Sequence, residues 1–194
     1  MAAMHKRSII GRRYLMWLAL SVLLLGAVFI WINRDEAVVL RLNLAARERE
    51  TAIDLDKDGR MEYCSLQRLY FVLRTETEMI WESPEEWKVE DYLYGDLTGN
   101  GEIELLLLVW KRGSFGSSRP FWLEADETTY SQHLYIYRLE HGDLRPVWMS
   151  SALQPQIVEW EWGEDPVWGN ILWLTHPGGE LGDWRWGEWG LERI

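Results

Sequence analysis

The most informative segment of the chain is the acidic window Asp54-Leu-Asp56-Lys-Asp58-Gly59-Arg-Met-Glu62. The same pattern returns 42 residues later as Asp96-Leu-Thr98-Gly-Asn100-Gly101-Glu-Ile-Glu104. Both windows have oxygen-bearing side chains at positions 1, 3, 5 and 9 and a glycine at position 6. Oxygen ligands on a tight turn suit a hard cation such as calcium. A loop that recurs at such a spacing also indicates a repeated structural unit.

The segments around the windows predict β structure. The apolar run Leu105–Trp110 is too short for a helix and is typical of a fully buried strand. His133–Leu139 alternates apolar side chains and is followed by the turn residues His141-Gly142-Asp143. Before the first window, Val39–Leu44 alternates as a half-buried strand does, although a helix through Ala37–Glu50 is also compatible with the residues.

A third unit emerges when Ile171–Leu174 is aligned on Leu105–Leu108. The equivalent loop is then Trp162–Asn170, whose positions 1, 5 and 9 are Trp, Pro and Asn, so we do not expect it to bind calcium. We therefore predict an all-β domain at 51–194 made of three propeller-blade-like antiparallel units. A blade is four strands in about 40 residues. The units are about 51–87, 88–155 and 156–194.

The middle unit is longer than the others, and we place the extra residues in an inserted loop, Lys111–Tyr130. Long loops are enriched in function, so Arg119-Pro120-Phe121-Trp122 is the predicted partner contact. Three units are too few for the usual ring of 4–8 blades. An open arc, a small three-bladed variant and a ring completed by another chain, including a second copy, all remain open. Leu40–Leu44 is a candidate strand to complete the last unit.

The N-terminal region predicts a membrane anchor. The uncharged run 14–32 has about the length that spans the hydrocarbon core of a bilayer. Four basic residues precede it, so residues 1–33 are interpreted as a cytoplasmic tail and one transmembrane signal anchor. Residues 34–50 would be a juxtamembrane segment, with the β domain outside the cytoplasm. A cleaved signal peptide is the alternative, but the run is long and no small-x-small site follows it.

The predicted exported part is strongly acidic. Residues 34–194 contain 16 Lys and Arg against 31 Asp and Glu, a net charge of −15. Such a charge argues against nucleic acid and anionic lipid as partners and is compatible with bound cations. Cys64 is the only cysteine, so no intrachain disulfide can form.

The two windows differ from EF-hand loops. An EF-hand needs a bidentate Glu at position 12, where this chain has Ser65 and Leu107. With the acid at position 9 and an apolar strand after it, the windows resemble the calcium loops of FG-GAP and VCBS repeats, the blades of integrin-alpha-type β-propellers. The resemblance covers roughly residues 51–194 as a repeat unit, and only the two loops match closely.

The resemblance implies two structural calcium ions. The first would be ligated by the side chains of Asp54, Asp56, Asp58 and Glu62 and the carbonyl of Arg60. The second would be ligated by the side chains of Asp96, Thr98, Asn100 and Glu104 and the carbonyl of Glu102. The first loop has more carboxylates, so we predict tighter binding there. The alternative is an Asx-rich turn that holds no metal.

The predicted activity is binding of a protein or surface partner. The histidines and serines form no recognisable catalytic motif, neither HExxH nor G-x-S-x-G. The alternative is an envelope protein that binds or processes glycans through a tryptophan surface. Its candidates are Trp160, Trp162, Trp168, Trp173, Trp184, Trp186 and Trp189, although core packing between units also accounts for them.

Overall fold

The computed structural model describes residues 17, 20–24, 34–45, 48–113 and 128–194. The chain divides into a segment 1–40 and a compact unit 41–194. Of the predicted span 14–32, residues 17 and 20–24 are described, and they are helical. Within the described ranges, no helix is both long enough and apolar enough to cross a membrane.

The predicted strand at Leu40–Leu44 is wrong. These residues belong to helix α2 (Arg34–Ala45), which corresponds to the helical alternative and ends before the first strand. Leu, Arg and Ala favour a helix, and the segment beyond Val39 has no β-branched residue to favour a strand. Leu42 is buried, and the guanidinium of Arg41 lies 5.3 Å from the ring centroid of Trp110.

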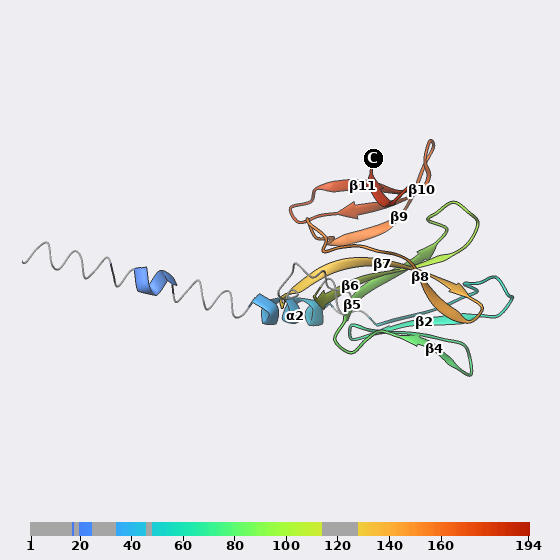
Figure 1. Cartoon of the computed structure of the whole chain (residues 1–194), viewed down its shortest axis with the longest axis horizontal. Helices are drawn as coiled ribbons and strands as arrows, with labels where there is room; N and C mark the ends of the chain where they lie inside the picture. Colours follow the sequence, from blue (N-terminus) through green and yellow to red (C-terminus); the bar gives the residue numbers. More distant parts are fainter. Residues whose placement is uncertain (1–16, 18–19, 25–33, 46–47, 114–127) are drawn as a thin grey trace, which may run out of the picture. The chain divides into compact units, whose positions relative to one another are not determined.

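Three four-stranded antiparallel sheets form the compact unit, which confirms the expectation of three antiparallel β units (Figure 1). In each sheet every strand pairs with the next strand in sequence, and none of the three sheets closes on itself. The first sheet consists of β1 (Arg49–Ile53), β2 (Glu62–Gln67), β3 (Tyr70–Arg74) and β4 (Met79–Glu82). The middle sheet consists of β5 (Lys88–Gly95), β6 (Glu104–Arg112), β7 (Tyr130–Glu140) and β8 (Asp143–Met149). The third sheet consists of β9 (Glu159–Asp165), β10 (Gly169–Thr175), β11 (Leu181–Gly187) and β12 (Gly190–Arg193).

The middle sheet is buried on both faces. Along β6, Leu105, Leu107 and Val109 belong to a core cluster shared with the first sheet. The alternate residues Leu106 and Leu108 belong to a second cluster shared with the third sheet. Because successive side chains of a strand point to opposite faces, β6 contributes to both cores. This is the physical reason for its uninterrupted apolar run.

The inserted segment of the middle unit lies between β6 and β7. The described residues end at Gly113 and resume at residue 128. The predicted partner contact Arg119–Trp122 therefore lies outside the described residues.

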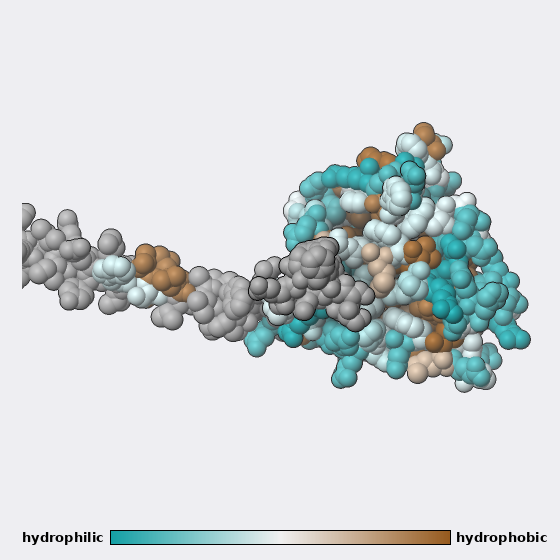
Figure 2. Space-filling model, viewed as in Figure 1, coloured by the Kyte–Doolittle hydropathy of each residue, from teal (hydrophilic) through white to brown (hydrophobic). Residues whose placement is uncertain are grey.

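The tryptophans of the third unit divide into two sets. Trp160, Trp162, Trp184 and Trp186 pack against the second core cluster, as the core-packing interpretation predicts. Trp168, Trp173 and Trp189 are 49%, 44% and 88% exposed. Figure 2 shows one face of the whole compact unit 41–194. This face is largely hydrophilic, with small and separate hydrophobic patches.

Cys64 offers a reporter of unfolding. Its side chain is fully buried in the first core cluster, and burial raises the pKa of the thiol to about 12. The thiolate is the reactive form, so labelling by a thiol reagent at pH 8 should be about a thousandfold slower in the native chain than in urea. A colorimetric disulfide reagent measures both rates. Rapid labelling without denaturant would contradict this placement of the side chain.

Candidate metal centre

The first acidic window connects β1 to β2 and folds into a turn held by its own carboxylates. Asp54 Oδ2 accepts a hydrogen bond from the Gly59 amide (3.0 Å), and Asp58 Oδ1 accepts one from the Arg60 amide (2.8 Å). Asp56 Oδ1 accepts from the Asp58 amide (3.2 Å). Gly59 has φ of 87°, a left-handed conformation that favours glycine. These contacts alone are also those of an Asx-rich turn.

The three aspartates of this turn converge. One carboxylate oxygen from each of Asp54, Asp56 and Asp58 lies within 4.8 Å of the other two. In the part of the chain that the structure describes, no other group of three His, Cys, Asp or Glu side chains has such geometry. Asp54 Oδ1 is enclosed and has no hydrogen-bond partner among the described residues. An enclosed oxygen without a partner is costly, and a cation bound between the aspartates would satisfy it.

Glu62, at position 9, closes the turn from β2. Its side chain is 3% exposed, and Oε2 accepts a hydrogen bond from the Leu55 amide (2.8 Å). The pKa of this carboxyl is raised above 4.5, chiefly because burial disfavours the charged form, and the nearby charges of the three aspartates raise it further. Four carboxyl groups thus crowd one loop. A bound cation would relieve their repulsion.

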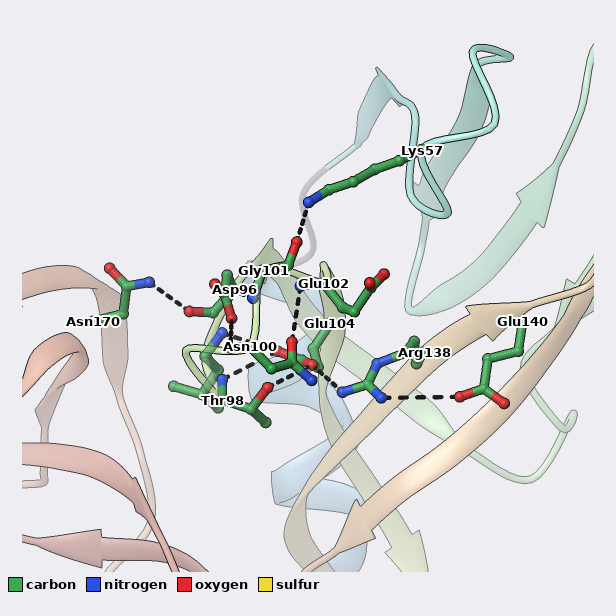
Figure 3. Close-up of polar contacts among 11 residues, drawn as sticks. Lys57, Asp96, Thr98, Asn100, Gly101, Glu102, Glu104, Arg138, Glu140 and Asn170 are labelled. Carbon is green, nitrogen blue, oxygen red and sulfur yellow. Dashed lines mark hydrogen bonds and ion pairs between the residues drawn. The ribbon is translucent and has the colours of Figure 1, made fainter.

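The second window connects β5 to β6 and repeats the same backbone scheme (Figure 3). Asp96 Oδ2 accepts from the Gly101 amide (2.9 Å), and Asn100 Oδ1 accepts from the Glu102 amide (2.8 Å). Gly101 also has φ of 87°. The shared pattern of the two sequences therefore corresponds to a shared set of hydrogen bonds.

Glu104 sets the second loop apart from the first. Its side chain is 0% exposed, and Oε1 accepts from Arg138 Nη2 (2.5 Å) and from Thr98 Oγ1 (3.0 Å). Oε2 accepts from the Leu97 amide (2.9 Å). Figure 3 shows Arg138 reaching this carboxylate from β7. No such cation pairs with Glu62 within the described ranges. At the first loop the guanidinium of Arg60 lies 3.9 Å from Asp58 Oδ2, but this pair is exposed, so a metal would compete with a buried ion pair only at the second loop.

The loops of neighbouring sheets are linked to each other. Lys57 Nζ, on the first loop, donates a hydrogen bond to the Gly101 carbonyl on the second. Asn170 Nδ2, on β10, donates to the Asp96 carbonyl (2.5 Å). Both contacts are drawn in Figure 3. The three equivalent connections therefore lie at the same end of the stacked sheets.

The third connection, between β9 and β10, is a short hairpin. Asp165 Oδ1 accepts hydrogen bonds from the amides of Val167 (2.8 Å) and Trp168 (2.9 Å). Asn170 occupies position 9 of the aligned window, and its amide contacts the second loop, so this side chain links two units.

Of the predicted side-chain ligands, the structure brings the carboxylates of Asp54, Asp56 and Asp58 together. The roles of Glu62 and of the side chains of the second window stay predictions. The proposed carbonyl ligands, those of Arg60 and Glu102, stay predictions. Sequence patterns do not identify Arg138 as part of this site, because it lies 34 residues from Glu104. The two residues are cross-strand partners in the pairing of β6 with β7, so only that register would have identified it.

Comparison with protein-family models, curated proteins and solved structures finds no match for this chain.

Proposed function

We propose that the chain is a membrane-anchored, extracytoplasmic calcium-binding module that acts by binding a protein or a surface partner. The observation that carries the proposal is the convergence of Asp54, Asp56 and Asp58 beside the enclosed, unpartnered Asp54 Oδ1. Hard oxygen ligands in this number suit calcium. The ion would be structural, because it would join β1 to β2 at a turn.

The blade-like arrangement supports the resemblance to FG-GAP and VCBS repeats. Each sheet is four sequential antiparallel strands, as in one propeller blade. The two acidic windows occupy equivalent places, between the first and second strands of their sheets. Three such blades, stacked through two separate cores, would form an open arc or part of a ring shared with a second chain.

The two calcium sites would differ in strength. The first loop offers Asp54, Asp56, Asp58 and Glu62, none of which is held by a buried cation within the described ranges. At the second loop, Arg138 already neutralises Glu104. Extracellular modules bind calcium at about 10⁻⁴–10⁻³ M, and we place the first site at the tighter end of this range.

Calorimetric titration of calcium into the full chain, purified in mild detergent and stripped with chelator, tests the sites. We expect a tighter site that Asp58→Asn removes and a weaker site that Asp96→Asn removes. Glu85→Gln, an exposed acid outside both loops, is the matched control and should bind as the wild type does. Indistinguishable titrations of wild type and Asp58→Asn would refute the first site.

The membrane anchor is proposed from the apolar run 14–32 and the basic residues before it. Retention of the chain in the membrane pellet after an alkaline carbonate wash tests it. Release into the supernatant would refute a retained anchor and favour the cleaved peptide.

The alternative function, glycan binding or processing, keeps one supporting observation. Trp168, Trp173 and Trp189 remain exposed on the third unit, and exposed aromatic rings can stack on sugars. A glycan array separates the alternatives: saturable binding that Trp173→Ala abolishes favours the glycan, whereas a calcium-dependent pull-down of one protein favours the module.

A further inference from the structure

The structure has a further place suited to a positive charge, outside the two acidic windows. A cavity of about 570 Å³ lies between β5 and β6 of the middle sheet and β9–β11 of the third sheet. Pockets that hold small organic molecules have about 300–1,000 Å³. The cavity is therefore large enough for a small organic ligand.

A β-bulge aims two carboxylates toward this cavity. In the pairing of β5 with β6, Val89 lies opposite Val109 and Asp91 lies opposite Leu108, so Glu90 is an extra residue. Asp91 shares the face of Leu108, which belongs to the core with the third sheet. Bulges commonly re-aim side chains beside functional sites. Here the bulge places Glu90 and Asp91 on one face, where plain alternation would separate them.

Buried donors hold both carboxylates in place. Glu90 Oε2 accepts hydrogen bonds from Trp110 Nε1 (2.6 Å) and Gln132 Nε2 (2.9 Å). The side chains of Trp110 and Gln132 are each 1% exposed. Asp91 Oδ2 accepts from Trp160 Nε1 (2.9 Å), which lies across the cavity on β9. The two acids are thus fixed by a built polar network, unlike freely solvated surface acids.

Acidic residues outnumber basic ones around the cavity. Five of the described residues that line it are Asp or Glu, and none is Lys, Arg or His. Arg49 pairs with Asp91 (3.0 Å), and Arg41 reaches Glu90 at 4.0 Å. The other three acids have no ion pair within the described ranges, and strand alternation turns their side chains to the face of the third sheet that is opposite to the core with the middle sheet. They are Glu159, Glu161 and Asp183.

The remaining wall is apolar and aromatic. Leu108, Trp160 and Leu174 line it. A bare metal ion would gain nothing from this wall. An ammonium group on an apolar body uses both features, because indole rings and leucines cover the body while the carboxylates attract the charge.

We propose that this cavity binds a small organic cation, a primary amine with an apolar or aromatic body, with its ammonium group at Glu90 and Asp91. This site is separate from the calcium loops and does not depend on them.

Binding of three probes of matched shape tests the proposal: benzylamine, benzyl alcohol and benzoate. Each is titrated calorimetrically into the full chain in chelator, which keeps calcium from the acidic loops. A charge-assisted contact in a partly buried site should make benzylamine bind at least about tenfold more tightly than benzyl alcohol, with benzoate the weakest. Equal affinity for the amine and the alcohol, or no binding of the amine at millimolar concentration, overturns the proposal.

Two variants that neutralise the acids of the bulge test whether the amine binds there. Glu90→Gln and Asp91→Asn keep the side-chain shape and should each weaken benzylamine by about tenfold. Glu188→Gln, an exposed acid on the turn between β11 and β12, is the matched control and should not change the affinity. Unchanged affinity in both bulge variants would also overturn the proposal. Should a variant fail to fold, the comparison of the three probes on the wild type still decides.

Discussion

Calcium is expected to raise the melting temperature of the full chain by about 3–6 °C. At a concentration ten times the dissociation constant, a ligand that binds only the folded state stabilises it by about 1.4 kcal/mol. For a domain of this size, each kcal/mol shifts melting by about 2–4 °C. Asp54→Asn and Asp58→Asn should remove most of the shift, because each removes one of the converging carboxylates of the tighter site. Scanning fluorimetry in calcium and in chelator measures it.

The same melting experiment, repeated at several pH values, gives a further test of the site. The folded chain raises the pKa of Glu62 above its ordinary value of 4.5, so the folded state binds the proton more tightly than the unfolded state does. In chelator, this group's contribution to stability is therefore present at low pH and is lost as pH rises through the raised pKa. Calcium should reverse the trend, since it needs the charged carboxylate. Glu85→Gln should behave as the wild type; equal melting curves in calcium and in chelator at neutral pH would refute the site.

Replacing Arg138 with methionine is expected to cost about 3–5 kcal/mol of unfolding free energy, the largest single-residue effect we predict. Glu104 is 0% exposed, and its Oε1 lies 2.5 Å from Arg138 Nη2. Loss of one partner leaves a buried charge uncompensated, which costs this much in proteins. Urea denaturation followed by tryptophan fluorescence measures the change.

Two companion variants make this test specific. Arg145→Met on β8 removes the same type of side chain from a pair whose members are 62% and 67% exposed, and such a surface pair contributes less than about 1 kcal/mol. Glu104→Gln combined with Arg138→Met removes the buried charge and should recover part of the loss. Equal costs for Arg138→Met and Arg145→Met would show that the buried pair is not special.

Sequence patterns predicted the structural features whose physical cause lies within a few neighbouring residues. Glycine at position 6 predicted the turn, and both Gly59 and Gly101 adopt φ of 87°. The unbroken apolar run Leu105–Trp110 predicted a strand buried on both faces, and β6 contributes to both cores. The segment at Leu40–Leu44 failed because its alternation fits a strand while its composition favours a helix, and the residues alone left both open.

Features that depend on strand register could not be predicted. Arg138 meets Glu104 only because β6 pairs with β7 in one register. The bulge at Glu90 is a single shift in the pairing of β5 with β6. The residue types near Glu90 do not indicate that the strand has an extra residue there. The division of the tryptophans between the core and the surface likewise depends on which face of the third sheet meets the middle sheet.

The place of β1 at the edge of its sheet has a mechanical consequence. β1 pairs only with β2, from Arg49 opposite Leu66 to Ile53 opposite Glu62. A pull on the chain before Arg49 loads these hydrogen bonds one after another and peels the strand toward Asp54. The tension reaches the acidic turn last. An ion held by Asp54 and Glu62 would tie the base of this hairpin together, and would act as a stop against unravelling under force.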